Sequence, residues 1–183
     1  TRTRPFATRI TSDEFMKGEK PDFMNVSCPM GPEQAKTYRT MAEMLMADID
    51  GQRITAQNAL VQLNKLLQVA SGFIIHDDGE SFEWFGDNKI NGALGIVEQL
   101  AEPVLCWVPF RAMQMRMLDA VRKRNEDPED NFNVPIILYS DRADIERWKE
   151  QGGIMMGHQG SGLGVGQNLQ HCAANIYLAP TFS

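Results

Sequence analysis

Hydrophobic residues before position 86 recur every three or four residues in two stretches, which is the spacing of one face of an α-helix. The first predicted helix begins at Pro32, a residue suited to a first helical turn, and ends near Asp50-Gly51. The second begins after Thr55, which can cap it, and ends at Ser71-Gly72. The apolar positions expected to define the two faces are Tyr38, Met41, Leu45 and Ile49, and then Leu60, Leu63, Leu67 and Ala70.

The segments beside these two helices have shorter patterns. Residues 1–30 carry prolines and glycines at irregular intervals, which predicts an extended arm lying on the domain, with one strand near Phe23 to Val26. Two apolar runs in residues 73–85 flank a turn at Asp77 to Glu80 and predict a small β-hairpin.

Beyond residue 86, short apolar runs of strand length alternate with amphipathic helices. Asp87 and Asp141 are placed to cap two of these helices, and a third runs from Phe110 through Val121. The predicted strands are Val104 to Val108, Ile136 to Tyr139, Ile154 to Met156 and Ile176 to Leu178, and a solvated loop is expected from Asn125 to Asn133. The alternation predicts an α/β domain over residues 31–183, with a parallel sheet covered on both faces and residues 31–86 as a helical and hairpin extension. Ligands of such sheets bind beyond the carboxyl ends of the strands.

Composition narrows the possible functions. The chain has 183 residues, 43% of them hydrophobic, which is enough to bury a core and excludes a disordered protein. Its net charge of −6 does not fit a basic, stand-alone DNA-binding protein, so any contact with nucleic acid is expected to be local and weak. No apolar run reaches membrane-spanning length, and residues 1–20 lack the apolar core of a signal peptide. Three cysteines without paired spacing favour a reducing cytoplasm, and no membrane partner is expected.

The most unusual stretch is the Gly-rich segment, residues 157–169, with five glycines in its first ten residues and a helix expected after it. Such density predicts that the backbone closely approaches a ligand or adopts positive φ angles. The segment is not a P-loop, because no lysine occurs after Lys149, and it also fails the G-x-G-x-x-G dinucleotide pattern. A connector without a ligand is the alternative interpretation.

The helix after Trp107 carries the main cluster of basic residues, opposed only by Asp119. A solvated helix face is the first interpretation of this cluster, and contact with phosphate is the second. The histidines are too far apart in sequence to suggest a zinc site, so no metal is expected, and no hydrolytic triad is supported. The basic residues of the cluster are Arg111, Arg116, Arg122, Lys123 and Arg124.

Four segments in order resemble the C-terminal RecA-like lobe of Swi/Snf-type superfamily-two helicases and DNA-dependent ATPases, especially short forms from phages and bacteria. Residues 30–38 are similar to the family's T-P-E-Q-x-K-x-Y entry, and residues 63–74 to its L-x-K-L-x-Q-I-x-S-G-F-I segment. Lys89, followed by the strand at residues 104–110, looks like the family lysine followed by motif IV. Residues 164–170, followed by residues 173–177, resemble motif V, G-x-G-x-N-L and then A-A-x-x-V-I. The resemblance covers residues 26–183.

The resemblance implies a RecA-like fold and the second motor lobe of an ATP-dependent helicase or translocase. Its implied partners are DNA, bound through the backbone, and a first RecA-like lobe, which would hold most of the contacts to ATP and Mg. No catalytic residue and no cofactor are expected in this chain alone. The residues expected to contact nucleic acid are Gln159, Gly160, Ser161, Gly162 and Arg111, and those expected at the ATP cleft through motif V are Gly164, Gly166, Gln167 and Asn168.

Two departures from the family pattern qualify this expectation. Relatives carry a serine or threonine where this chain has Gly162, and here the hydroxyl stands at Ser161 instead. The chain has no Walker A lysine and no Asp-Glu-x-His box, and the arginines of motif VI would follow Ser183, so the lobe is expected to be incomplete at its C-terminal end and inactive alone. A non-catalytic RecA-like binding or scaffold module is one alternative, and an unrelated Rossmann-like enzyme is another. A Walker A motif and an Asp-Glu box on the same polypeptide would favour the motor.

Overall fold

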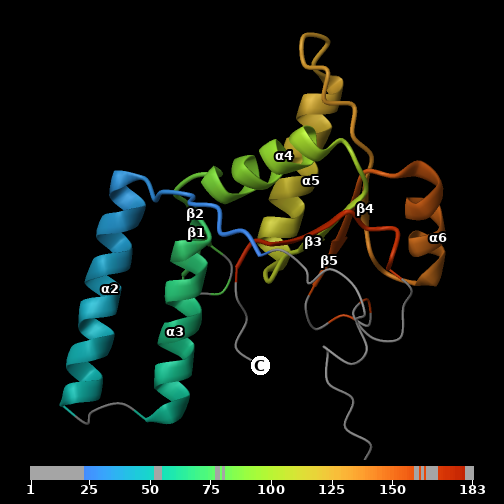
Figure 1. The fold of residues 1–183 in the computed structure, drawn as a ribbon. Coiled ribbons are helices and arrows are strands. Elements are labelled where there is room, and N and C mark those ends of the chain that lie inside the picture. The colour runs from blue at the N-terminus through green and yellow to red at the C-terminus, as the bar shows by residue number, and fades with distance from the viewer. Residues whose placement is uncertain are drawn as a thin grey trace, which may run out of the picture.

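The computed structural model describes residues 23–51, 55–76, 79, 81–158, 161, 163 and 169–179 (Figure 1). The elements in chain order are α2 (Pro32–Asp50), α3 (Ala56–Ala70), β1 (Phe73–Ile75), β2 (Phe82–Trp84), α4 (Asn88–Leu100), β3 (Val104–Trp107), α5 (Arg111–Glu126), β4 (Ile136–Leu138), α6 (Arg142–Gln151), β5 (Ile154–Gly157) and β6 (Ala174–Tyr177). The predicted order of helices and strands is therefore confirmed from Pro32 to Gly157, and so is the last strand. No helix among them is long and apolar enough to cross a membrane.

The centre of the fold is a parallel sheet in the order β4-β5-β3-β6, as the alternating pattern predicts. Every residue of β3 and β5 is buried, because helices cover both faces of these central strands. Side chains from α4 and α5 form one hydrophobic core with the sheet, and side chains from α6 form a second core on the opposite face. The fold class expected from the sequence is confirmed.

Helices α2 and α3 form a pair that stands beside the sheet (Figure 1). Their ends fall where the sequence predicts, but their buried faces differ from the prediction. On α3 the buried apolar residues are Leu66 and Val69, whereas the predicted Leu60 is 57% exposed. Of the apolar face predicted for α2, only Leu45 is fully buried. None of the other described helices forms a second layer over the pair, and several of its apolar side chains are exposed, among them Met44, Met46, Leu60 and Val61.

The β1–β2 hairpin joins this helical pair to the sheet domain. Phe73 is fully buried and contacts Trp84 and Phe110, with ring centroids 5.2 and 5.3 Å away. Gly72, just before β1, has a φ of +99°, and a Cβ there would overlap the carbonyl oxygen of Gly86. This position therefore requires glycine.

Several smaller expectations are wrong. Residues 23–31 contain no strand, and Phe23 is 93% exposed, because no neighbouring strand lies beside them to pair with. Residues 169–173 form a turn instead of the start of the helix expected after the Gly-rich segment. The loop after α5 is not simply solvated, since Phe132 is buried beneath the guanidinium of Arg124 at 3.9 Å from its ring centroid.

Candidate nucleic-acid interface

The carboxyl ends of the parallel strands meet at one edge of the sheet, as they must in a parallel arrangement. Hydrogen bonds continue across this edge for one residue beyond the strands. Val108 N donates to Gly157 O at 2.9 Å, Leu178 N donates to Trp107 O at 3.1 Å, and Tyr139 N donates to Met156 O at 2.9 Å. These bonds fix the points at which the connecting segments leave the sheet, so the carboxyl edge is the ordered base on which a ligand site would be built.

The Gly-rich segment begins at this edge and is anchored there by its first residues. His158 Nε2 donates to the carbonyl oxygen of Pro109, 2.8 Å away, which ties the end of β5 to the residues that follow β3. The amide and the hydroxyl of Ser161 both donate to His158 O, at 2.8 and 2.6 Å, and close a tight turn. In this structure the donors of Ser161 are therefore used within the segment, although this residue was expected to contact nucleic acid.

Leu163 is a second anchor of the Gly-rich segment. Its side chain is fully buried in the core that α6 covers, and it lies directly against Gly157. A Cβ at Gly157 would overlap the Leu163 methyl group Cδ2, so glycine at this position makes room for the anchor. Leu169 returns the segment to the same core.

Most of the predicted site residues of the segment lie outside the described residues. These are Gln159, Gly160 and Gly162 of the expected nucleic-acid contacts, and Gly164, Gly166, Gln167 and Asn168 of motif V. The segment starts at the carboxyl edge, where His158 follows β5, and Leu169 at its other end packs against the core that α6 covers, ahead of the start of β6. The predicted roles of these residues remain predictions.

Arg111 is the first residue of α5, which begins at the carboxyl edge because it follows β3 directly. Its side chain is exposed and forms no ion pair with any described residue. It lies two residues after Pro109, whose carbonyl oxygen holds His158. The structure thus places Arg111, which has no ion pair among the described residues, two residues from the contact that anchors the start of the Gly-rich segment.

The other arginines of the predicted basic cluster are neutralised by carboxylates. Arg116 binds Asp87 through Nη2 at 2.8 Å, and Arg124 binds Asp130 through Nε at 2.6 Å and Glu98 through Nη2 at 3.3 Å. Arg122 Nη2 lies 2.8 Å from Asp119 Oδ1. Because its carboxylate is held by Arg116, Asp87 makes no side-chain cap on α4, contrary to the prediction. Arg116, Arg122 and Arg124 therefore do not form a basic surface, because carboxylates of the same helix, of the following loop and of the region around α4 pair with them.

A buried carboxylate occupies the same edge at the start of α6. Asp144 accepts hydrogen bonds from the amide and hydroxyl of Ser140, each at 2.7 Å, and also contacts Arg147. The Ser140 hydroxyl and the other donors hold the pKa of Asp144 at about 2. Asp141 caps the helix as predicted, accepting from Ala143 N at 2.8 Å. This group stays ionised and fully engaged, so its role is to fix the turn between β4 and α6.

A cysteine thiol and a metal-binding cluster are two further kinds of reactive group that a site in the described part of the chain could use. Burial raises the pKa of the Cys106 thiol, within β3, to about 12, so this cysteine is a neutral core residue. Over the described ranges, no group of three or more His, Cys, Asp or Glu residues is placed to hold a metal ion. The sequence did not identify the contact of His158 with Pro109, because the two residues lie far apart in the chain and no local pattern links them.

Comparison with solved structures finds the SWI2/SNF2 ATPase core of Sulfolobus solfataricus in complex with dsDNA. The TM-score is 0.52 and the sequence identity is 18%, and the match covers 85% of this chain and 34% of that chain. At this identity the likeness establishes the fold, which is RecA-like, and this chain spans about a third of the length of that ATPase core. No family model matches the sequence, and no curated protein does.

Proposed function

We propose that this chain is the second motor lobe of an ATP-dependent DNA helicase or translocase. In this proposal the carboxyl edge of the sheet contacts the DNA backbone, and the Gly-rich segment completes a cleft for ATP with a first RecA-like lobe. The observation that carries the proposal is that Arg111, without an ion pair among the described residues, begins α5 at the same sheet edge as the anchored start of the Gly-rich segment. The RecA-like fold, shared with a Swi/Snf ATPase core, supports it.

The physical basis of DNA contact is a set of donors that carry no sequence preference. Glycine-rich backbone allows amide groups to approach phosphate oxygens closely, since no Cβ intervenes. The guanidinium of Arg111 adds a charged donor with a geometry that suits phosphate. Contacts of this kind position a protein on the backbone without reading bases.

In this proposal the first lobe and this chain contribute different residues to the ATP cleft. ATP and its Mg would be held mainly by the first lobe, which supplies the charge that stabilises phosphoryl transfer. The residues of this chain that would face that cleft are Gly164, Gly166, Gln167 and Asn168. His158 and Leu163 would hold the first half of the segment in place, so that closure of the two lobes would move this part together with the sheet edge.

A binding experiment with this chain tests the proposal. A fluorescein-labelled DNA duplex is titrated with the chain, and fluorescence anisotropy is followed at several salt concentrations. We expect a Kd in the range of about 10⁻⁴ to 10⁻⁶ M that rises with salt. Arg111→Ala should weaken binding and lower the salt slope by about one.

The matched control is Lys123→Ala. Lys123 is also exposed and has no ion pair among the described residues, but it lies in the last turn of α5, roughly 18 Å along the helix from Arg111. This variant should bind like the parent chain. Binding that is absent, or that is independent of salt and of Arg111, would contradict the proposal and favour a scaffold module instead.

A further inference from the structure

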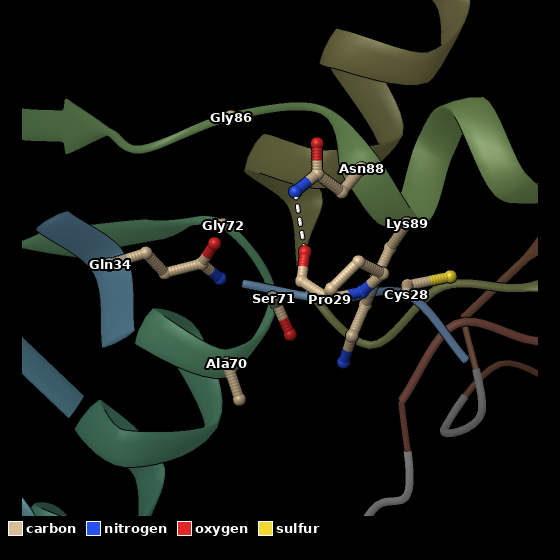
Figure 2. Close-up of a pocket in the computed structure, with 9 residues that line it drawn as sticks. All are labelled: Cys28, Pro29, Gln34, Ala70, Ser71, Gly72, Gly86, Asn88 and Lys89. Atoms are coloured by element: carbon tan, nitrogen blue, oxygen red, sulfur yellow. Dashed lines mark hydrogen bonds between the residues drawn. The ribbon is translucent and has the colours of Figure 1, made fainter. Parts of the chain in front are cut away.

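Three segments that are far apart in the sequence meet at a small pocket between the helical pair and the sheet domain. Gln34 comes from α2, Ser71 and Gly72 follow α3, and Lys89 lies in the first turn of α4 (Figure 2). Each belongs to a different one of the sequence segments that resemble the helicase lobe. The remaining lining residues are Cys28, Pro29, Ala70, Gly86 and Asn88.

The neutral polar groups of this pocket already have partners. Gln34 Nε2 donates to Val69 O at 2.7 Å, and Ser71 Oγ donates to Leu67 O at 2.7 Å. Asn88 Nδ2 donates to Pro29 O at 2.6 Å, the bond drawn in Figure 2. The walls of the pocket are therefore fixed by hydrogen bonds that do not involve a ligand.

Lys89 is different. Its side chain runs from α4 past Pro29 toward the level of Ser71 and Ala70, and it is half-buried (Figure 2). Its ammonium forms no hydrogen bond or ion pair with any described residue, and no acidic residue lines the pocket. Burial lowers the pKa of Lys89, an effect opposed in part by Cys28.

Asp87, the acidic residue nearest to Lys89 in the sequence, is already paired with Arg116. The carboxylate of Asp87 accepts three hydrogen bonds from Arg116, at 2.9, 3.2 and 2.8 Å. A half-buried cation without a counter-charge is costly, because desolvation weakens its hydration and nothing replaces it. Such a site gains most when an external anion enters it.

The position of the pocket indicates which anion this is. Helix α4 leads into β3, so the first turn of α4 lies toward the carboxyl edge of the sheet, where Arg111 begins α5. We propose that Lys89 binds a phosphate group of the DNA backbone and extends the contact surface from Arg111 to the junction with the helical pair. This inference rests on the proposed function and adds a residue and a second contact point to it.

The test compares Lys89→Met with Lys89→Arg in the same salt-dependent anisotropy titration. Methionine keeps an apolar stem of similar length and removes the charge, so binding should weaken about tenfold at 0.1 M salt, with the salt slope lower by about one. Arginine retains the charge and should preserve the slope. Lys123→Ala is the control for an exposed lysine elsewhere, and circular dichroism checks that each variant is folded.

The outcomes separate this inference from the proposed function. If Arg111→Ala weakens DNA binding and Lys89→Met does not, the Lys89 site is overturned while DNA contact at the carboxyl edge stands. If the parent chain does not bind DNA at any salt concentration, both proposals fail. Should Lys89→Met unfold, Lys89→Gln gives the same comparison with a polar side chain.

Discussion

Asp144 illustrates how much a single buried carboxylate contributes at the edge of the sheet. It is 4% exposed, and its hydrogen bonds join the end of β4 to the first turn of α6. Its folded-state pKa of about 2 lies below the ordinary value of 3.8, so ionisation favours the folded protein. The stabilisation is therefore complete above the ordinary pKa and disappears as the pH falls through the folded pKa.

We predict that Asp144→Asn lowers the free energy of unfolding by about 1–2 kcal/mol at pH 7, because the amide is a weaker acceptor for the same donors. The difference from the parent chain should narrow as the pH falls from about 4 towards 2, which urea unfolding at a series of pH values measures. A difference that stays constant across this range would show that the charge of Asp144 contributes nothing.

The contact between Gly157 and Leu163 is the second residue-scale feature that bears on the site. We predict that Gly157→Ala destabilises the chain by about 1–3 kcal/mol, because the added methyl group must displace a fully buried leucine. It should also weaken DNA binding, since Leu163 anchors the Gly-rich segment.

Gly95 provides the matched control for this substitution. It lies within α4, where an added Cβ meets nothing within 4 Å, so Gly95→Ala should stabilise the chain by about 0.5–1 kcal/mol. Thermal melts of both variants make the comparison. A Gly157→Ala variant that melts like the parent and binds DNA normally would mean that Leu163 does not position the segment.

At the scale of elements, local patterns predicted the helices and strands but not what covers them. Thr55 and Asp141 act as caps because a cap depends only on the next few residues. The buried face of α3 depends on where α2 and the hairpin lie, and the spacing of Leu60 and Leu63 carries no information about that. The partners of Arg116 and Arg124 are likewise set by tertiary structure, so a helix that appears basic in sequence is neutralised in the fold.

The Arg116–Asp87 pair links three elements, because Arg116 also lies over the Trp84 ring at 5.3 Å. We predict a coupling energy of about 1 kcal/mol between Arg116 and Asp87 in a double-mutant cycle, since the contact is bidentate and the side chains are 39% and 27% exposed.

The Arg122–Asp119 pair on the same helix is the control for this cycle. Its side chains are 65% and 48% exposed, so its coupling should be below about 0.5 kcal/mol. Urea unfolding of the single and double variants provides both values. Equal coupling energies for the two pairs would contradict the view that the Arg116–Asp87 pair helps to hold the hairpin, α4 and α5 together.

For the whole molecule, the sequence predicted the parallel α/β, RecA-like fold, which the structure confirms, and ligand binding at the carboxyl edge of the sheet stays a prediction. It did not predict which charges remain unpaired there, because pairing depends on contacts between distant segments. With a net charge of −6 and most arginines of α5 neutralised, the proposed contact with DNA would depend on a few groups at the carboxyl edge. The central claim is therefore that DNA contacts this chain at the carboxyl edge of the sheet.

Backbone amide NMR of the ¹⁵N-labelled chain, titrated with a short DNA duplex, tests this claim most directly. The expected weak binding permits resonances to be followed during the titration, and the Gly-rich segment is observed along with the rest of the chain. We predict that the largest shifts occur at Phe110 and Arg111 and across residues 158–168, that they diminish with added salt, and that the last turn of α5 is unaffected. Shifts confined to the far ends of α2 and α3 or to the last turn of α5, or no shifts at all, would contradict contact with DNA through the carboxyl edge.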